Sequence, residues 1–86
     1  MKEKRANSIS EVDMSGLITP VIAVYEHPEG FPGKYVAMVF DALHPTGTVI
    51  IKDSLLDIQS DIGENTSRIF IPRVAEDVGS LVGVWV

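Results

Sequence analysis

The strand-like segments of this chain are apolar on both of their faces, and this feature limits its possible folds more than any other. Side chains of a β-strand point alternately to the two sides of a sheet, so a strand with one side in water alternates apolar and polar residues. The segments 17–27, 34–42 and 81–86 lack that alternation. Both sides of the sheet that they form therefore need cover.

The sequence predicts an α+β fold of order βββαββ, a mainly antiparallel sheet with one short helix packed on one face. β-Branched and aromatic residues predict strands at 17–27, 34–42 and 48–52, at the segment SRIFIP and at the segment LVGVWV. A turn is expected at HPTG, between the second and third strands. The last strand is almost wholly apolar, so we expect it to be paired on both sides, because an open apolar edge promotes aggregation.

The segment DSLLDIQSDIG predicts the helix, because its apolar residues recur every three to four positions. Asp53 or Ser54 is expected to cap the N-terminus and Gly63 to end the helix. The apolar face of this helix carries Leu55, Ile58 and Ile62. Its other face carries Asp53, Asp57, Asp61 and Glu64. These acids are spread along the helix axis, so we interpret them as a solvated face rather than a metal site.

Residues 1–16 are polar and show neither a helical nor a strand period, so we expect a flexible leader before one domain at 17–86. Twelve acidic residues against seven basic give a formal charge of −5. That balance argues against nucleic acid as a partner, because phosphate backbones are bound by clustered Lys and Arg. Neither a signal-peptide pattern nor a bilayer-spanning apolar run is visible. We therefore expect a cytoplasmic protein without a membrane partner.

Residues able to carry chemistry are few. The chain has no cysteine, which removes thiolate nucleophiles, disulfides and cysteine metal sites. His27 and His44 each precede a proline and have no partner at metal-ligand spacing, so we interpret them as turn residues held extended. A catalytic role would require one of them beside a carboxylate in a concave pocket. The sequence predicts no catalytic residue, no metal and no cofactor.

One helix of about ten residues covers only one side of a sheet. The other side needs the leader, a second copy or a partner protein as cover, and there we expect an interaction face. We assign to it Val21, Ala23, Tyr25, Tyr35, Ala37, Val39 and Trp85. The leading hypothesis is a non-enzymatic protein-binding or assembly module of unknown function that self-associates as a homodimer through this face.

The segment from Gly33 to Ile62, together with the VWV ending, resembles a group of small uncharacterised bacterial proteins common in Firmicutes. They share Y-V-A-x-x-x-D followed by P-T and a D-x-L helix start, and the resemblance implies no activity. The same segment resembles in layout the βββα unit of HicB-like antitoxins. HPTG and KDSLLDI stand where that family has a P-G-C-like turn and a G-D-T-x-E-E-A helix start. This resemblance implies the alternative function, an acidic antitoxin or regulator that neutralises a basic toxin.

Overall fold

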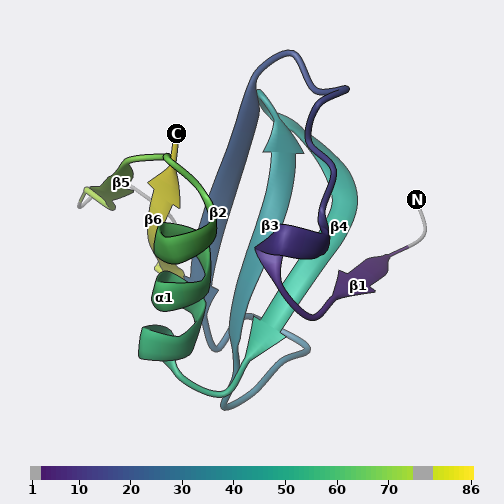
Figure 1. Ribbon diagram of the computed structural model, residues 1–86. Helices are drawn as coiled ribbons and strands as arrows, with labels where there is room; N and C mark the ends of the chain where they lie inside the picture. Colours follow the sequence, from purple (N-terminus) through teal and green to yellow (C-terminus); the bar gives the residue numbers. More distant parts are fainter. Residues whose placement is uncertain (1–2, 75–78) are drawn as a thin grey trace.

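A computed structural model describes residues 3–74 and 79–86 of the chain (Figure 1). Its elements are β1 (Lys4–Ala6), the 3-10 turn η1 (Ile9–Glu11), β2 (Pro20–Glu26), β3 (Tyr35–Asp41), β4 (His44–Lys52), α1 (Leu55–Asn65), β5 (Phe70–Pro72) and β6 (Leu81–Trp85). All six strands form one sheet in the order β1-β4-β3-β2-β6-β5. The predicted α+β class is confirmed, and the βββαββ layout is matched apart from an added N-terminal strand.

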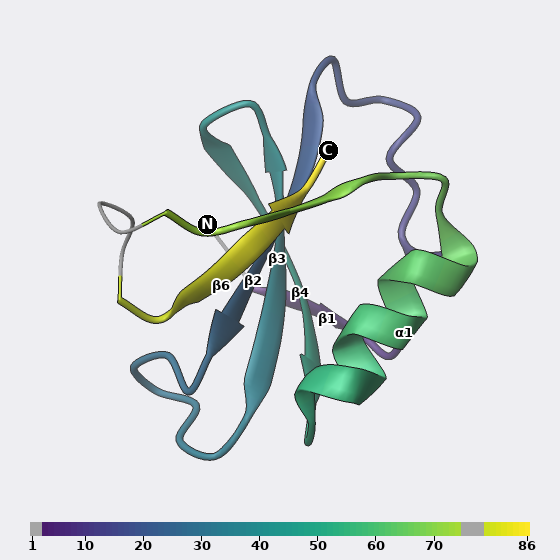
Figure 2. The same cartoon turned by 90° about the vertical axis from the view of Figure 1, so that its left-hand side faces the viewer.

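The sheet is antiparallel except at one edge, where β1 runs parallel to β4. β2, β3 and β4 form a meander, and α1 then carries the chain across the sheet to β5 at the far edge. β6 returns between β5 and β2, so the expectation that the last strand is paired on both sides is confirmed. Figure 2 shows α1 on one side of a strongly twisted sheet.

The helix begins where the sequence indicates and ends later than expected. Ser54 caps it, accepting a hydrogen bond from the backbone N–H of Asp57 at 3.1 Å. Gly63 does not end the helix, which continues to Asn65. Thr66 closes it without a left-handed residue, because its backbone N–H and its hydroxyl both donate to the carbonyl of Ile62, at 3.0 and 2.8 Å.

The turn between β3 and β4 lies two residues before the predicted HPTG turn. Asp41 pairs with His44, so Ala42 and Leu43 form a two-residue hairpin loop. Ala42 has a φ of 54°, a conformation that glycine or asparagine usually signals, and neither is present at this position. The HPTG residues instead begin β4, where Gly47, with a φ of 88°, lies in a bulge.

Four apolar side chains of residues 3–16 pack on the core, where a flexible leader was expected: Ala6, Ile9, Val12 and Met14. Ile9 is 2% exposed and belongs to the core. The carboxylate of Asp61 accepts hydrogen bonds from the Ile9 backbone N–H, at 2.7 Å, and from the Ser8 hydroxyl. These bonds join residues more than fifty positions apart, so the local pattern of residues 1–16 could not reveal them.

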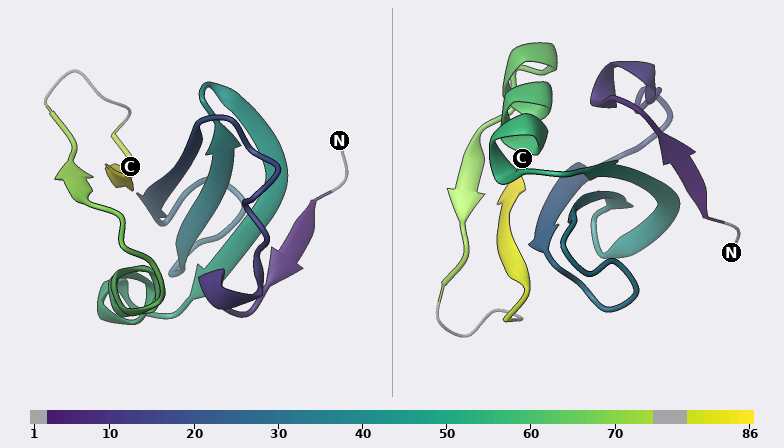
Figure 3. Two further views of the ribbon diagram at one scale, coloured as in Figure 1. Left: turned by 45° about the horizontal axis from the view of Figure 1, so that its top comes forward. Right: turned by 90° about the horizontal axis from the view of Figure 1, so that it is seen from below.

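The main core lies between α1, η1 and one side of the sheet, and both helical elements lie on that side in Figure 3. On the opposite side, Ala23, Val36 and Val49 are also buried. The bulge between Met38 and Phe40 bends β4, and Figure 3 shows β4 curling around. The curled sheet thus covers part of its own second side, and the part over β2, β6 and β5 stays open.

Candidate functional site

The seven residues predicted as one interaction face lie on opposite sides of the sheet. Directly paired residues of antiparallel strands project to the same side. Val39 pairs with Ile22 and Ala37 with Val24, and all four belong to the core beneath α1. Tyr35 and Trp85 pack against that core as well. The face assignment was therefore wrong for Tyr35, Ala37, Val39 and Trp85.

Of the seven predicted residues, only Val21, Ala23 and Tyr25 project to the side that α1 leaves open. Their partners on β3 are Phe40, Met38 and Val36, respectively. The error arose because alternation divides the side chains of each strand between two faces. It does not show which face of one strand lies on the same side of the sheet as a given face of the next strand. A shift of one residue in register exchanges the sides, and register is a property of the folded sheet.

An apolar groove runs over the open side. It is lined by residues of β2, of the β3–β4 hairpin and of β6, namely Val21, Ala23, Tyr25, Phe40, Ala42, Leu43, Leu81 and Val84, and has a volume of about 220 Å³. A second hollow of about 280 Å³ extends it over β5 and is lined by Ile71, Pro72, Arg73, Val74, Leu81, Gly83 and Val84. Leu81 and Val84 line both, so we treat the two hollows as one surface and call it the apolar groove.

A β-bulge in β6 gives the groove one of its walls. Val24 pairs with Gly83, whereas the next residue, Tyr25, pairs with Leu81, so Val82 is an extra residue in the strand. Val82 packs against the main core, and Leu81 lines the groove beside Tyr25. Without the extra residue, Leu81 would project to the other side of the sheet.

The rim of the groove exposes large apolar side chains. Leu43, at the tip of the β3–β4 hairpin, is 90% exposed, and Ile71 and Val74 also face solvent. Neither Leu43 nor Ile71 was predicted for the interaction face. The available signal at position 43 is an apolar residue between a predicted strand and the HPTG segment, where a turn usually carries polar side chains.

The groove holds little charge. Of the residues that the structure describes, one charged side chain, Arg73, and no acidic side chain line its two hollows. The phenol of Tyr25 is partly withdrawn from water, and this burial raises its pKa above the ordinary value of 10.0. The Tyr25 hydroxyl is therefore neutral at physiological pH. A molecule that binds in the groove would contact mainly apolar surface.

The helix acids have more varied partners than a uniformly solvated face. Asp53 pairs with Lys34, whose hydrogen bond and positive charge lower the pKa of the Asp53 carboxyl. Asp61 holds the N-terminal segment through Ser8 and Ile9. Asp57 and Glu64 are exposed. Within the described residues, no group of three or more His, Asp or Glu side chains is placed to hold a metal ion.

The two histidines are not among the lining residues of the groove. His27 is not extended as expected, since its φ is 47°, and its ring lies 4.9 Å from the ring of Tyr35, centroid to centroid. His44 is exposed at the start of β4. Neither side chain lines the groove, so the described structure does not bring a histidine into it.

The remaining observations concern membrane-spanning helices, the predicted connector and the comparisons with known proteins. Across residues 3–74 and 79–86, no helix is long and apolar enough to cross a membrane. The predicted connector RVAEDVGS lies partly outside these residues, at positions 75–78. Compared with known proteins, the chain matches no family model, no curated protein and no solved structure.

Proposed function

We propose that this protein is a small non-enzymatic assembly module that forms a homodimer through the apolar groove. The observation that carries the proposal is an open, nearly uncharged groove bordered by an exposed leucine on the same surface. Apolar surface of this kind is usual at protein–protein contacts and unusual on a monomer. The proposal places the protein in the bacterial cytoplasm, with no cofactor, nucleic acid or membrane taking part.

Charge favours a second copy as the occupant. Each chain carries a formal charge of −5, so two copies repel one another over most of their surface. Among residues 3–74 and 79–86, no acidic residue lines the groove. Two copies that meet there bring no carboxylate of the described residues face to face. The groove is thus a surface through which this acidic chain can approach its own copy.

Shape supports the same occupant. In a two-fold dimer each surface meets an identical surface, so a projecting side chain must find a recess close to it on the same face. Leu43 projects at the hairpin tip and lines the groove that continues to Leu81 and Val84. Inserting Leu43 of each copy into the groove of the other would stabilise the dimer by about 1.5–3 kcal/mol per leucine.

The test is the mass of the protein in solution, measured by light scattering or sedimentation at tens of micromolar. We expect a dimer for the native chain and a monomer for Leu43→Asp, because a carboxylate at this position would be buried without a partner. Leu56→Asp is the matched control, since Leu56 is an exposed leucine on α1, outside the groove. A native monomer, or equal dissociation by both variants, would refute the proposal.

A neutralising antitoxin is the second candidate. The meander of β2, β3 and β4 leading into α1 has the order of the βββα unit that the HicB-like resemblance implies, and the net negative charge suits a basic partner. The neighbouring reading frame is the test. A small, basic, histidine-containing protein encoded there, and bound by this chain, would support the antitoxin function, and a frame without one would remove it.

A further inference from the structure

A polar cavity that is wide open to solvent lies outside the apolar groove, where three separate segments meet. It has a volume of about 520 Å³ and is lined by Met14, Asn65, Thr66, Ser67, Arg68 and Val86. These residues come from the N-terminal segment, from the connection between α1 and β5, and from the residue after β6. The cavity and the groove share no lining residue, so ligand binding in the cavity does not depend on the proposed dimer.

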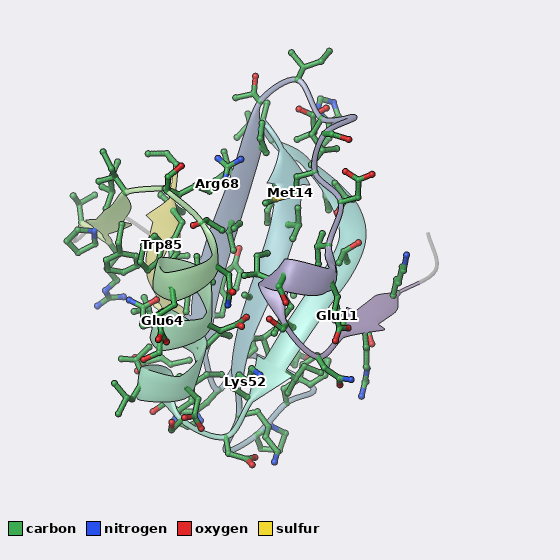
Figure 4. The ribbon with its side chains drawn as sticks, viewed as in Figure 1. Glu11, Met14, Lys52, Glu64, Arg68 and Trp85 are labelled. Atoms are coloured by element: carbon green, nitrogen blue, oxygen red, sulfur yellow. The ribbon has the colours of Figure 1, made fainter. Side chains whose placement is uncertain are left out.

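Arg68 is the charged group of this cavity. Its side chain is half-buried, and one terminal nitrogen donates a hydrogen bond to the carbonyl of Pro20 at 3.1 Å. Figure 4 shows Arg68 beside β2, between the end of α1 and the segment that carries Met14. This bond to a carbonyl of β2 directs the guanidinium toward the cavity.

Arg68 makes no ion pair with a residue that the structure describes. The ion pairs among the described residues join Arg5 to Glu3 and Lys34 to Asp53, and none involves Arg68. A guanidinium has five N–H donors in a planar fork that matches two oxygens of a carboxylate or phosphate. With one bond made to Pro20, most of these donors remain for a ligand in the cavity.

The other lining residues are three polar ones, Asn65, Thr66 and Ser67, and two apolar ones, Met14 and Val86. The side-chain amide nitrogen of Asn65 already donates to Asp61. The Ser67 hydroxyl makes no hydrogen bond to the described residues, so it is available as a donor next to Arg68. The Thr66 hydroxyl is already engaged with the Ile62 carbonyl, at 2.8 Å. Met14 and Val86 add apolar surface. The cavity therefore offers cationic and hydroxyl donors beside an apolar wall.

We infer that this cavity binds a small oxyanion, a carboxylate or phosphate group with a short apolar substituent, through the Arg68 guanidinium and the Ser67 hydroxyl. The oxygens of the anion accept from both groups, and the substituent lies against Met14 and Val86. The net charge of −5 repels anions from the molecule as a whole, so anion binding at this place requires local donors.

The experiment follows the backbone amide signals of residues 65–68 and 86 by NMR while acetate, butyrate or inorganic phosphate is added at constant ionic strength. Chloride is the control anion, because it has the charge without the paired oxygens. We expect saturable shifts confined to these residues with at least one oxyanion and not with chloride. Comparison of the affinities for acetate and phosphate shows whether a carboxylate or a phosphate group is preferred. Tighter binding of butyrate than of acetate would show that the substituent contacts the apolar side chains of Met14 and Val86.

Variants test the assignment to Arg68. Arg68→Gln is expected to weaken oxyanion binding at least about tenfold, because the charged fork is lost. Arg68→Lys, which keeps the charge and loses the fork, is expected to bind with intermediate affinity. Arg5→Gln is the matched control, since Arg5 is exposed on β1 and does not line the cavity. Its affinity is expected to equal that of the native chain.

Ser67→Ala keeps the inference testable if loss of the Pro20 hydrogen bond unfolds the Arg68 variants. Ser67 is exposed and bonds no described residue, so its replacement is expected to preserve the fold and to weaken oxyanion binding severalfold. Equal shifts with chloride and acetate would overturn the inference, as would unchanged affinity in both Arg68→Gln and Ser67→Ala.

Discussion

The two sides of the central strands have similar amino acids and different surroundings. On the helix side, Ile22 and Val24 are fully buried beneath α1 and η1. On the other side, their neighbours Val21 and Tyr25 line the apolar groove and are only partly covered. Apolar composition thus predicts that a surface requires cover, but it does not predict whether the cover comes from the same chain. A second molecule that covered the open side would therefore bury more exposed apolar surface than one that covered the helix side.

The largest loss of stability is expected from a substitution on the helix side of the sheet. Ile58→Ala removes a fully buried side chain of α1 and is expected to lower the free energy of unfolding by about 2–5 kcal/mol, through lost burial and the cavity left behind. Val84→Ala, on the open side, should cost the isolated monomer less, about 1 kcal/mol. Urea unfolding at low protein concentration measures both. Equal losses would mean that the two sides are equally packed.

The next largest effect concerns the N-terminal segment on the helix side. Asp61→Asn replaces the carboxylate that accepts from Ser8 and Ile9, and should cost about 1–3 kcal/mol because charge-assisted hydrogen bonds are weakened. Faster amide hydrogen exchange at Ile9 should accompany the loss. Glu64→Gln, an exposed acid on the same helix, is the control and should change little. Unaltered exchange at Ile9 in Asp61→Asn would show that the two bonds do not hold the segment.

A smaller effect is expected at the start of α1. Ser54→Ala removes the acceptor for the Asp57 backbone N–H and should lower stability by about 1 kcal/mol. Ser54→Asp keeps an acceptor at the cap and should retain most of the native stability. Thermal unfolding of the three proteins measures the difference. If the alanine and aspartate variants were equally destabilised, the hydroxyl bond would not be the cause.

The smallest effect is a pH dependence at the surface. The hydrogen bond and charge of Lys34 lower the pKa of Asp53 below its ordinary 3.8, so this pair stabilises the fold above about pH 4 and loses its contribution as the pH falls through the lowered value. Lys34→Gln should therefore be slightly less stable than the native chain at pH 7 and equally stable in stronger acid. Chemical unfolding at both pH values makes the comparison. A difference that persisted in stronger acid would have another origin.

Local sequence patterns were sufficient for the elements that depend on local interactions. The change of apolar spacing and a cap at Asp53 or Ser54 located the start of α1, and β-branched runs located β2, β3 and β6. Local patterns failed where a distant residue decides the conformation. Asp61 orders the N-terminal segment, and Ala42 adopts a left-handed conformation that its residue type does not signal.

The candidate site shows the same division. Val21, Ala23 and Tyr25 were predicted for the open side and lie there, whereas Tyr35, Ala37, Val39 and Trp85 lie beneath the helix. No strand by itself contains the information that would have separated the two groups, because it lies in the pairing of β2 with β3 and with β6. Leu81 reaches the groove only through the bulge at Val82.

The sequence by itself determined that this chain forms an α+β sheet with apolar residues on both sides and one amphipathic helix, because period and residue type act over a few neighbouring positions. The tertiary structure alone decided which residues the helix covers, how far the curled sheet covers itself, and where the open groove lies. Those outcomes depend on strand register and on contacts between residues far apart in the chain, and a one-residue shift in register would have exchanged the two sides.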